Sequence, residues 1–242
     1  MSSHAKLTGV HHYVEFKEET INARVAKMVE LRESLDASKL HVKLSYGNRK
    51  TTALVPSVSL IPIADCPNCE HCKKGCYDIR NCCCYNETQK MRANNSAILH
   101  DDMERYFHEI YLQVQFLRYF RWHCGGEIIS FWYWEHIVDI ARRTPTCEFL
   151  VFTKMFNLVN HWLDRGNEIP GNLHVIFSDW RGLPMKNPYN LPVSSPVWKD
   201  GTMGKHVTDR QFWCPSNCAE CAEAGKGCWT AGKGDTILFE AH

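Results

Sequence analysis

Cys147-Glu-Phe-Leu-Val-Phe-Thr153 is the stretch that decides the fold, because it has the composition of a buried strand. A helix is expected from about 155 to 165, and Gly166 ends it. The next apolar run, Leu173-His-Val-Ile-Phe-Ser178, predicts a further strand. Because strands that alternate with helices form parallel sheets with right-handed crossovers, this region predicts an α/β fold.

The same alternation extends toward the N-terminus. Phe120-Arg-Trp-His-Cys124 is strand-like, and a helix is expected near 132–143. Apolar residues at spacings of three and four predict two earlier helices, 18–37 and 97–117. Two strands, 41–46 and 52–62, are expected around the turn at Gly47-Asn48.

The number of strand–helix units limits the architecture. Three or four units are too few for an eight-stranded barrel, so we expect a partial (βα) barrel or an open parallel sheet. Residues 180–212 contain four prolines and are expected to be irregular. We therefore predict three parts: an N-terminal helical segment at 1–40, an α/β core at 41–212, and a cysteine-rich metal-binding segment at 213–242.

Most of the cysteines fall into two clusters. Of the 13 cysteines, seven belong to the first cluster and four to the second. The first contains Cys66, Cys69, Cys72, Cys76, Cys82, Cys83 and Cys84, and the second contains Cys214, Cys218, Cys221 and Cys228. An odd cysteine count without an export signal argues against a disulfide framework. We expect a cytoplasmic protein whose reduced thiols bind metal.

The first cluster has the spacing of a bacterial ferredoxin. Cys66-x2-Cys69-x2-Cys72-x3-Cys76 is typical of iron–sulfur ligation, although Tyr77 replaces the usual proline. This compact spacing favours a [4Fe-4S] cluster over zinc, which usually joins two separate knuckles. If Cys82, Cys83 and Cys84 are extended, their side chains alternate, and at most one or two are ligands. Buried packing of these thiols is the alternative.

The second cluster, Cys214-x3-Cys218-x2-Cys221-x6-Cys228, offers another four thiolates. Its first three cysteines match the spacing of radical SAM enzymes. In those enzymes, however, the motif follows the first strand, and an aromatic residue stands where this chain has Glu220. We therefore predict a second four-thiolate site that holds either an iron–sulfur cluster or zinc.

His123-Cys124-Gly125-Gly126-Glu127 lies where a predicted strand ends, as do Thr153-Lys154 and Ser178-Asp179. Paired glycines let a ligand approach the backbone, and a neighbouring carboxylate can bind an ammonium group. His123, Gly125, Gly126 and Glu127 are therefore candidate cofactor-binding residues, with SAM as a possible cofactor. The alternative is a tight turn with a solvated glutamate.

The overall charge restricts the partners. The formal net charge is +1 and no long run of Lys or Arg occurs, so nucleic acid is not an expected partner. No apolar run approaches the ~20 residues of a membrane helix. A redox partner or a small molecule is expected instead. The sequence does not specify either of them, nor the oligomeric state.

Together these motifs resemble the phage "gene product eighty-eight" family, from about Gly47 to Trp229. The resemblance is carried by Asn48-Arg-Lys-Thr51, Ser59-Leu-Ile-Pro62, Cys66-Pro67, Cys76-Tyr77, His123, Gly126-Glu127, Cys214-Pro215, Cys218, Cys221 and Cys228-Trp229. It implies a cysteine-ligated iron–sulfur centre on a radical-SAM-like α/β core, without an assigned reaction. Cys82 to Cys84 are additional to the family pattern, and Glu127 replaces its usual Asp. A glutamate after two glycines is similar to the radical SAM motif that contacts the amino group of SAM.

The functional hypothesis is an iron–sulfur protein with a redox or other cluster-dependent role and no specified substrate. Two alternatives stay open. The first is a radical SAM-like enzyme that binds SAM through Gly125, Gly126 and Glu127. The second is a structural zinc protein that binds a partner. No catalytic residue is assigned.

Overall fold

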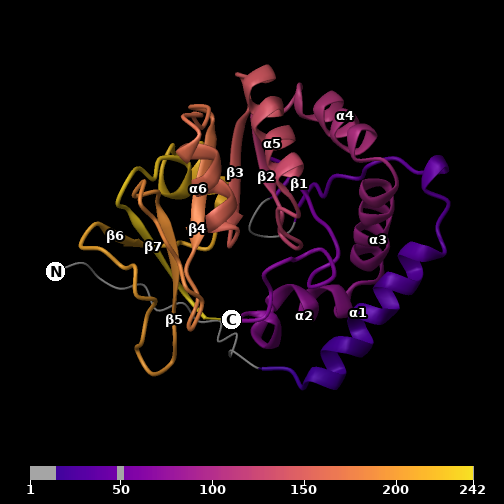
Figure 1. Ribbon diagram of the computed structural model, residues 1–242, viewed down its shortest axis with the longest axis horizontal. Coiled ribbons are helices and arrows are strands. Elements are labelled where there is room, and N and C mark those ends of the chain that lie inside the picture. Colours follow the sequence, from indigo (N-terminus) through magenta and orange to yellow (C-terminus); the bar gives the residue numbers. More distant parts are fainter. Residues whose placement is uncertain (1–14, 48–51, 242) are drawn as a thin grey trace.

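The computed structural model describes residues 15–47 and 52–241, and its centre is one seven-stranded parallel sheet. The strands are β1 (Ser57–Val58), β2 (Tyr119–Trp122), β3 (Glu148–Thr153), β4 (Leu173–Ser178), β5 (Val193–Val197), β6 (Gln211–Trp213) and β7 (Thr236–Glu240). Their order is β1-β2-β3-β4-β5-β7-β6, and every neighbouring pair is parallel. The predicted α/β class is confirmed. The sheet is open, with β1 and β6 at its edges (Figure 1).

The helices cover the sheet and one of its edges. They are α1 (Glu18–Glu33), α2 (Tyr77–Cys84), α3 (Asn86–Asp101), α4 (Met103–Val114), α5 (Phe131–Arg143), α6 (Phe156–Asp164) and α7 (Cys218–Glu223), with short 3-10 turns η1 (Ala37–Lys39), η2 (Lys73–Gly75) and η3 (Gly227–Trp229). Figure 1 shows α1, α2 and α3 beyond the β1 edge of the sheet. None of the described helices is both long and apolar enough to cross a bilayer.

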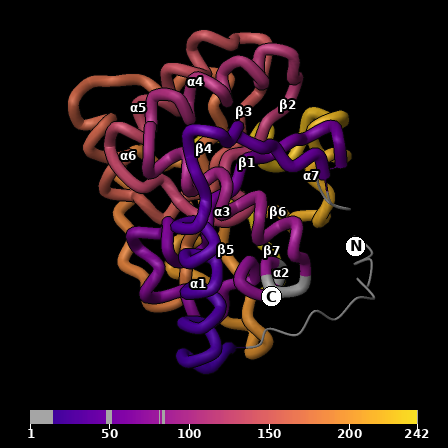
Figure 2. Tube along the Cα trace, turned by 90° about the vertical axis from the view of Figure 1, so that its right-hand side faces the viewer, coloured from indigo at the N-terminus to yellow at the C-terminus, as the bar shows by residue number. Residues whose placement is uncertain are grey.

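Both faces of the sheet are buried. Along β3, Phe149 and Val151 belong to the main core, whereas Leu150 joins a second core that includes Cys221 and Trp229. Figure 2 shows α5 and α6 on one side of the molecule and α7 on the other. Because parallel strands need cover on both faces, the cysteine-rich C-terminal segment completes the core. The interior strand β7 contributes Ile237 to the same core.

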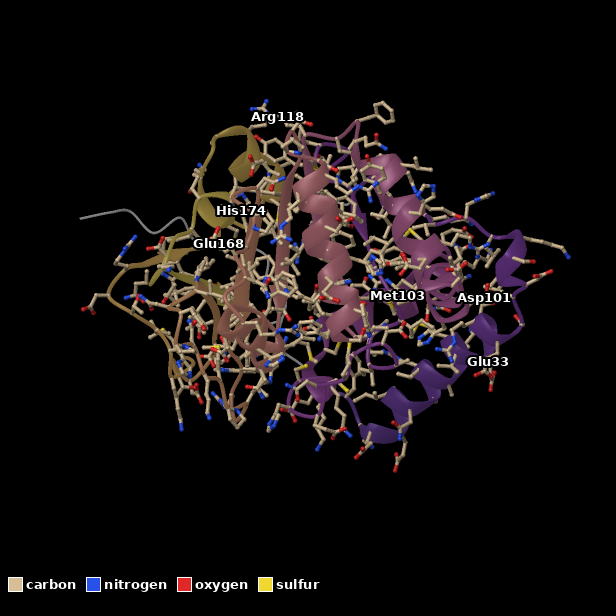
Figure 3. All side chains as sticks on the ribbon, turned by 45° about the horizontal axis from the view of Figure 1, so that its top comes forward. Glu33, Asp101, Met103, Arg118, Glu168 and His174 are labelled. Carbon is tan, nitrogen blue, oxygen red and sulfur yellow. The ribbon has the colours of Figure 1, made fainter. Side chains whose placement is uncertain are left out.

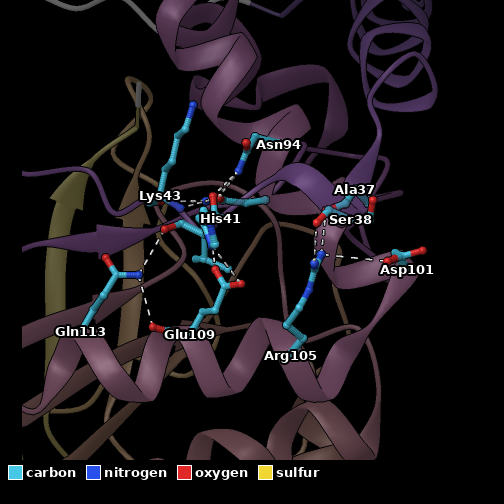
Figure 4. Close-up of polar contacts among 11 residues, drawn as sticks. Ala37, Ser38, His41, Lys43, Asn94, Asp101, Arg105, Glu109 and Gln113 are labelled. Atoms are coloured by element: carbon cyan, nitrogen blue, oxygen red, sulfur yellow. Dashed lines mark hydrogen bonds and ion pairs between the residues drawn. The ribbon is translucent and has the colours of Figure 1, made fainter.

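The predicted strand at 41–46 is wrong, because side chains take the place of a strand partner. The Val42 amide donates to the Glu109 carboxylate at 2.7 Å. The side-chain amide of Asn95 pairs with both the N–H and the C=O of Lys43, each at 2.9 Å. The neighbouring Asn94 donates to the His41 carbonyl at 2.8 Å (Figure 4). Only Ser45 forms a bridge, antiparallel to Ser57. The second predicted strand shortens to β1, and Asn48 of the predicted turn lies outside the described residues.

The predicted single helix at 97–117 is also wrong. Two helices, α3 and α4, meet at Asp102, which has extended dihedral angles (φ −148, ψ 96). The Asp102 side chain accepts the Arg105 amide at 2.9 Å and so forms the N-cap of α4. Most of α3 lacks apolar periodicity because it buries polar residues, including Asn94 and Asn95. The part of α3 that precedes residue 97 therefore gave no apolar periodicity from which a helix could be predicted.

The extended arrangement considered for Cys82, Cys83 and Cys84 is wrong, because these residues form the last turn of α2. Cys82 is fully buried beside Met28, Ile61 and Ile79. That environment matches the alternative in which this thiol packs as a small apolar group.

Residues 180–212 are more regular than expected, since they contain β5 and most of β6. Pro196 lies in β5, where it is in register with Phe239 of β7. The pairing between β4 and β5 ends at Ser194, so Pro196 has a strand neighbour on one side only. A proline, which lacks an N–H donor, is tolerated there.

Asn95→Ala should destabilise the fold by about 2–4 kcal/mol. The substitution leaves the backbone groups of Lys43 and the buried Ser59 carbonyl without their partner. Chemical denaturation checks this. Lys90→Ala, at an exposed site on the same helix, should stay within about 0.5 kcal/mol of the native chain. Equal stability of the two variants would show that Asn95 does not hold this segment.

Candidate metal-binding site

The first cysteine loop leaves β1 and crosses the carboxyl ends of β2 and β3. The Leu60 amide donates to the Gly125 carbonyl at 2.9 Å, and the Glu127 amide donates to the Asp65 carbonyl at 2.9 Å. On the β3 side, the Asn68 side chain donates to the Lys154 carbonyl at 3.3 Å. The loop is therefore fixed at the edge where open α/β sheets build their ligand sites.

The four predicted ligands lie within residues 66–76 of this loop, which contains a tight turn at 69–73. The Cys69 carbonyl accepts the amides of Cys72 and Lys73, at 3.0 and 2.8 Å. The Cys66 sulfur accepts the Ile63 amide at 3.3 Å. Burial raises the pKa of the Cys76 thiol to about 11. Burial and the nearby Glu127 charge raise the pKa of Cys66 well above its usual value.

Two cations adjoin this loop. Burial lowers the pKa of Lys154, but the nearby Cys72 and Glu127 side chains outweigh this effect and raise that pKa overall. Arg92 is buried on α3, forms an ion pair with Asp78, and lies in the field of Cys76. Positive charges in a poorly solvated site stabilise thiolates, so the surroundings suit an anionic, thiolate-ligated group.

The ligand shell itself is not assembled. Among residues 15–47 and 52–241, no three His, Cys, Asp or Glu side chains converge closely enough to hold a metal ion. The assignment of Cys66, Cys69, Cys72 and Cys76 as ligands stays a prediction.

The second set of cysteines is gathered around one pocket on the opposite face from α5 and α6. Its four sulfur-bearing residues line this pocket together with apolar groups: Cys214, Cys218, Cys221, Cys228, Leu150, Phe212, Trp229 and Ile237. The indole N–H of Trp229 donates to the Cys218 carbonyl at 3.2 Å. His174 of β4, which Figure 3 labels, contacts the same indole ring, with centroids 6.0 Å apart.

Arg121 of β2 supplies positive charge to this pocket. Its Nη1 donates to the Cys218 sulfur at 3.6 Å, and its guanidinium lies 5.0 Å from the centre of the Phe152 ring. Burial raises the pKa values of Cys228 and Cys221. The four cysteines line one apolar pocket beside a cation, and thiols are residues that bind zinc or an iron–sulfur cluster; this site too stays a prediction.

The residues of the candidate SAM motif make contacts within the protein. His123 has a left-handed backbone (φ 53), and its Nε2 lies 2.7 Å from the Tyr133 hydroxyl. Burial lowers its pKa to about 3, so the imidazole is neutral. The Glu127 carboxylate accepts three hydrogen bonds, from the Ile128 amide, the Thr153 hydroxyl and the Lys154 amide, at 2.8 to 2.9 Å. Burial raises the pKa of Glu127.

The two glycines are required by close packing. A Cβ at Gly125 would overlap Arg92 and Asp78. At Gly126 (φ +86), a Cβ would lie 2.6 Å from the Cβ of Leu60. Packing therefore explains why both positions are glycine. A role for this motif in binding SAM stays a prediction.

Sequence reasoning missed the cations that surround the thiols. The position of Lys154 after a predicted strand was a weak indication of a role at the ligand-binding edge of the sheet. Arg121 has the alternating position of an ordinary strand residue, and Arg92 lies in the polar helix α3. Only the tertiary arrangement places these three charges beside cysteines.

An open parallel α/β sheet with one four-cysteine loop at its carboxyl edge and four more cysteines on one face defines a cysteine-rich α/β protein. The chain belongs to the Gene product 88 family, which it matches over residues 25–181. This match includes the first cysteine loop and residues 123–127, and it ends before the second cysteine set. In comparisons with curated proteins and with solved structures, nothing matches.

His123 should make the stability of this protein depend on pH. Its folded pKa of about 3 lies below the ordinary 6.5, so its contribution is complete above pH 6.5 and is lost as the pH falls toward 3. Between these two pKa values, the contribution of His123 to the free energy of unfolding changes by roughly 1.4 kcal/mol per pH unit. His123→Asn, which tolerates the left-handed backbone but does not titrate, should abolish this dependence.

Urea unfolding at pH 7.5 and pH 5 measures this pH dependence of stability, with the native chain and the His123→Asn variant in the same metal state. Between these pH values the native chain should lose about 2 kcal/mol more than the variant. Parallel pH profiles would contradict a buried neutral His123.

Proposed function

We propose that this protein binds an iron–sulfur cluster through Cys66, Cys69, Cys72 and Cys76 and serves a redox or cluster-dependent role. The observation that carries the proposal is the position of the first cysteine loop. Its four cysteines lie at the carboxyl edge of the sheet, next to the partly buried cation Lys154. The ferredoxin-like spacing supplies the type of group.

The surrounding residues have distinct tasks in this proposal. Because burial keeps the free Cys66 and Cys76 thiols protonated, ligation releases their protons, and binding strengthens as pH rises. Lys154 and Arg92 then balance the thiolate charge. When bound, the cluster would supply one-electron chemistry. Its reduction potential would respond to these charges and to the exclusion of water.

We further propose that Cys214, Cys218, Cys221 and Cys228 hold a second metal centre, either zinc or an iron–sulfur cluster. This proposal rests on their shared pocket beside Arg121. Because Trp229 and Cys221 also belong to the second core, metal here would fasten the C-terminal segment onto β2, β3 and β4.

Metal analysis of cysteine variants tests both centres. Protein purified anaerobically, after growth with ample iron, should be brown and contain iron and acid-labile sulfide. Cys76→Ala should remove the metal of the first site and leave the second, whereas Cys221→Ala should do the reverse. Stoichiometric zinc without iron or sulfide in the native chain would exclude an iron–sulfur cluster at either site.

Cys147→Ala is the matched control, because Cys147 is buried in the main core away from both cysteine sets. It should retain full metal. Circular dichroism distinguishes loss of a ligand from loss of fold. Full metal content in Cys76→Ala would overturn the ligand assignment of the first site.

An enzyme of the radical SAM type is the second candidate function. It is favoured by one observation: Gly125, Gly126 and Glu127 follow β2 directly beside the cysteine loop that follows β1. Radical SAM chemistry requires an iron that is not ligated by cysteine. The four-cysteine loop offers full ligation, so we favour the closed cluster.

SAM should therefore leave the electron paramagnetic resonance spectrum of the reduced protein unchanged, and no 5′-deoxyadenosine should form. A SAM-dependent change in the spectrum that Glu127→Gln abolishes would instead favour the enzyme. A SAM-dependent change that Glu127→Gln retains would show that SAM binds without this carboxylate.

A further inference from the structure

A cavity of about 310 Å³ lies at the carboxyl ends of β4 and β5. Two tryptophans and several charged residues line it: Glu15, His71, Trp180, Arg181, Trp198, Lys199 and Asp200. Trp180 and Arg181 follow β4, and Trp198 and Lys199 follow β5. His71 comes from the first cysteine loop, and its Nδ1 lies 3.7 Å from an ideal Cβ on Gly182. The cavity thus occupies the edge where open parallel sheets bind small molecules.

The aromatic walls are arranged to receive a flat ring. Trp180 and Trp198 meet edge to face, with centroids 5.1 Å apart and planes at 82°. Lys154 Nζ lies 5.6 Å from the centre of the Trp180 ring. Because Trp198 is largely buried and Trp180 only partly, Trp180 is the ring with more surface left to cover. An aromatic ligand gains stacking energy on such a surface.

The charged side of the cavity is built around Arg181. Its guanidinium carbon lies 4.6 Å from the centre of the Trp198 ring. Its Nη2 contacts both carboxylate oxygens of Asp200 at 3.2 Å and also bonds to the Thr202 hydroxyl. These contacts orient the guanidinium plane, and every hydrogen bond that it makes to described residues uses Nη2. Its other donor edge has the fork geometry that binds a phosphate or carboxylate.

From this arrangement we propose that the cavity binds a small molecule in which a flat ring is joined to an anionic group, of the nucleoside monophosphate class. The ring lies against Trp180, and Arg181 receives the anionic group, with Lys199 adding positive charge. The volume is at the low end for small-molecule sites and suits one such ligand. This inference goes beyond the proposed metal function, and His71 places the ligand beside the first cysteine loop.

Calorimetric titration of the full-length, metal-loaded protein with AMP, adenosine and ribose 5-phosphate tests the proposal. AMP should bind one per chain, and the two fragments should bind at least about tenfold more weakly, because each lacks one of the two contacts. Failure of AMP to bind, or equal binding of AMP and adenosine, would overturn the proposal.

Two variants locate the site. Arg181→Ala should weaken the binding of AMP about tenfold and leave the binding of adenosine unchanged. Trp180→Leu, which keeps an apolar side chain, should weaken the binding of both AMP and adenosine. Trp132→Leu, at a 71% exposed position on α5, is the control and should change neither. Equal AMP affinity in the native chain and the Trp180 and Arg181 variants, with unaltered thermal unfolding, would place the binding elsewhere and refute the assignment.

Discussion

The need to satisfy buried backbone groups at the carboxyl ends of β1, β2 and β3 governs this structure. Two carboxylates meet that need. Glu127 receives the amides of Ile128 and Lys154, and Asp65 receives the Ile61 amide at 2.9 Å. Asp65 also lies 2.8 Å from Nε2 of His100 on α3. Because an unpaired buried N–H costs about 1–3 kcal/mol, these two side chains fix the loops on which the first cysteine set stands.

Charge balance around the thiols follows from this framework. Once the loops are fixed, Lys154 follows β3 and Arg92 projects from α3 toward the same region. Arg121 extends from β2 toward the other cysteine set. Buried Arg92 has an anionic partner in Asp78, whereas Lys154 and Arg121 are partly buried. Thiolates that bind metal would add negative charge beside these cations at both cysteine sets.

The two faces of the sheet are covered in different ways. One face is covered by helices with continuous apolar stripes, such as α5, which buries Tyr133, Trp134 and Ile137. The other face has the short helix α7 and the turn η3, whose Trp229 packs edge to face on Tyr119. A segment this short buries little apolar surface by itself. Metal ligation at its cysteines would therefore add to its stability as well as to any chemistry.

The sequence by itself determined the elements whose residues are apolar with a regular period. Strands β3 and β4 and helices α5 and α6 were predicted within one or two residues, because burial on a sheet imposes that pattern. The cysteine spacings identified both candidate metal sets. The family was also predicted, from the cysteine motifs together with short motifs such as Asn48-Arg-Lys-Thr51 and Gly126-Glu127, and is confirmed; the match runs over 25–181 and does not reach the second set.

Only the tertiary structure decided the elements and contacts that depend on distant partners. The segment at 41–46 is not a strand, because Asn95 and Glu109 satisfy its backbone from other elements. Helix α3 buries the polar residues Asn94 and Asn95, because both form hydrogen bonds to that segment. The cavity lined by Trp180 and Trp198 joins residues from two strand ends and the cysteine loop. Local periodicity does not predict such pairings, because each forms only when the parallel sheet brings the strand ends to one edge.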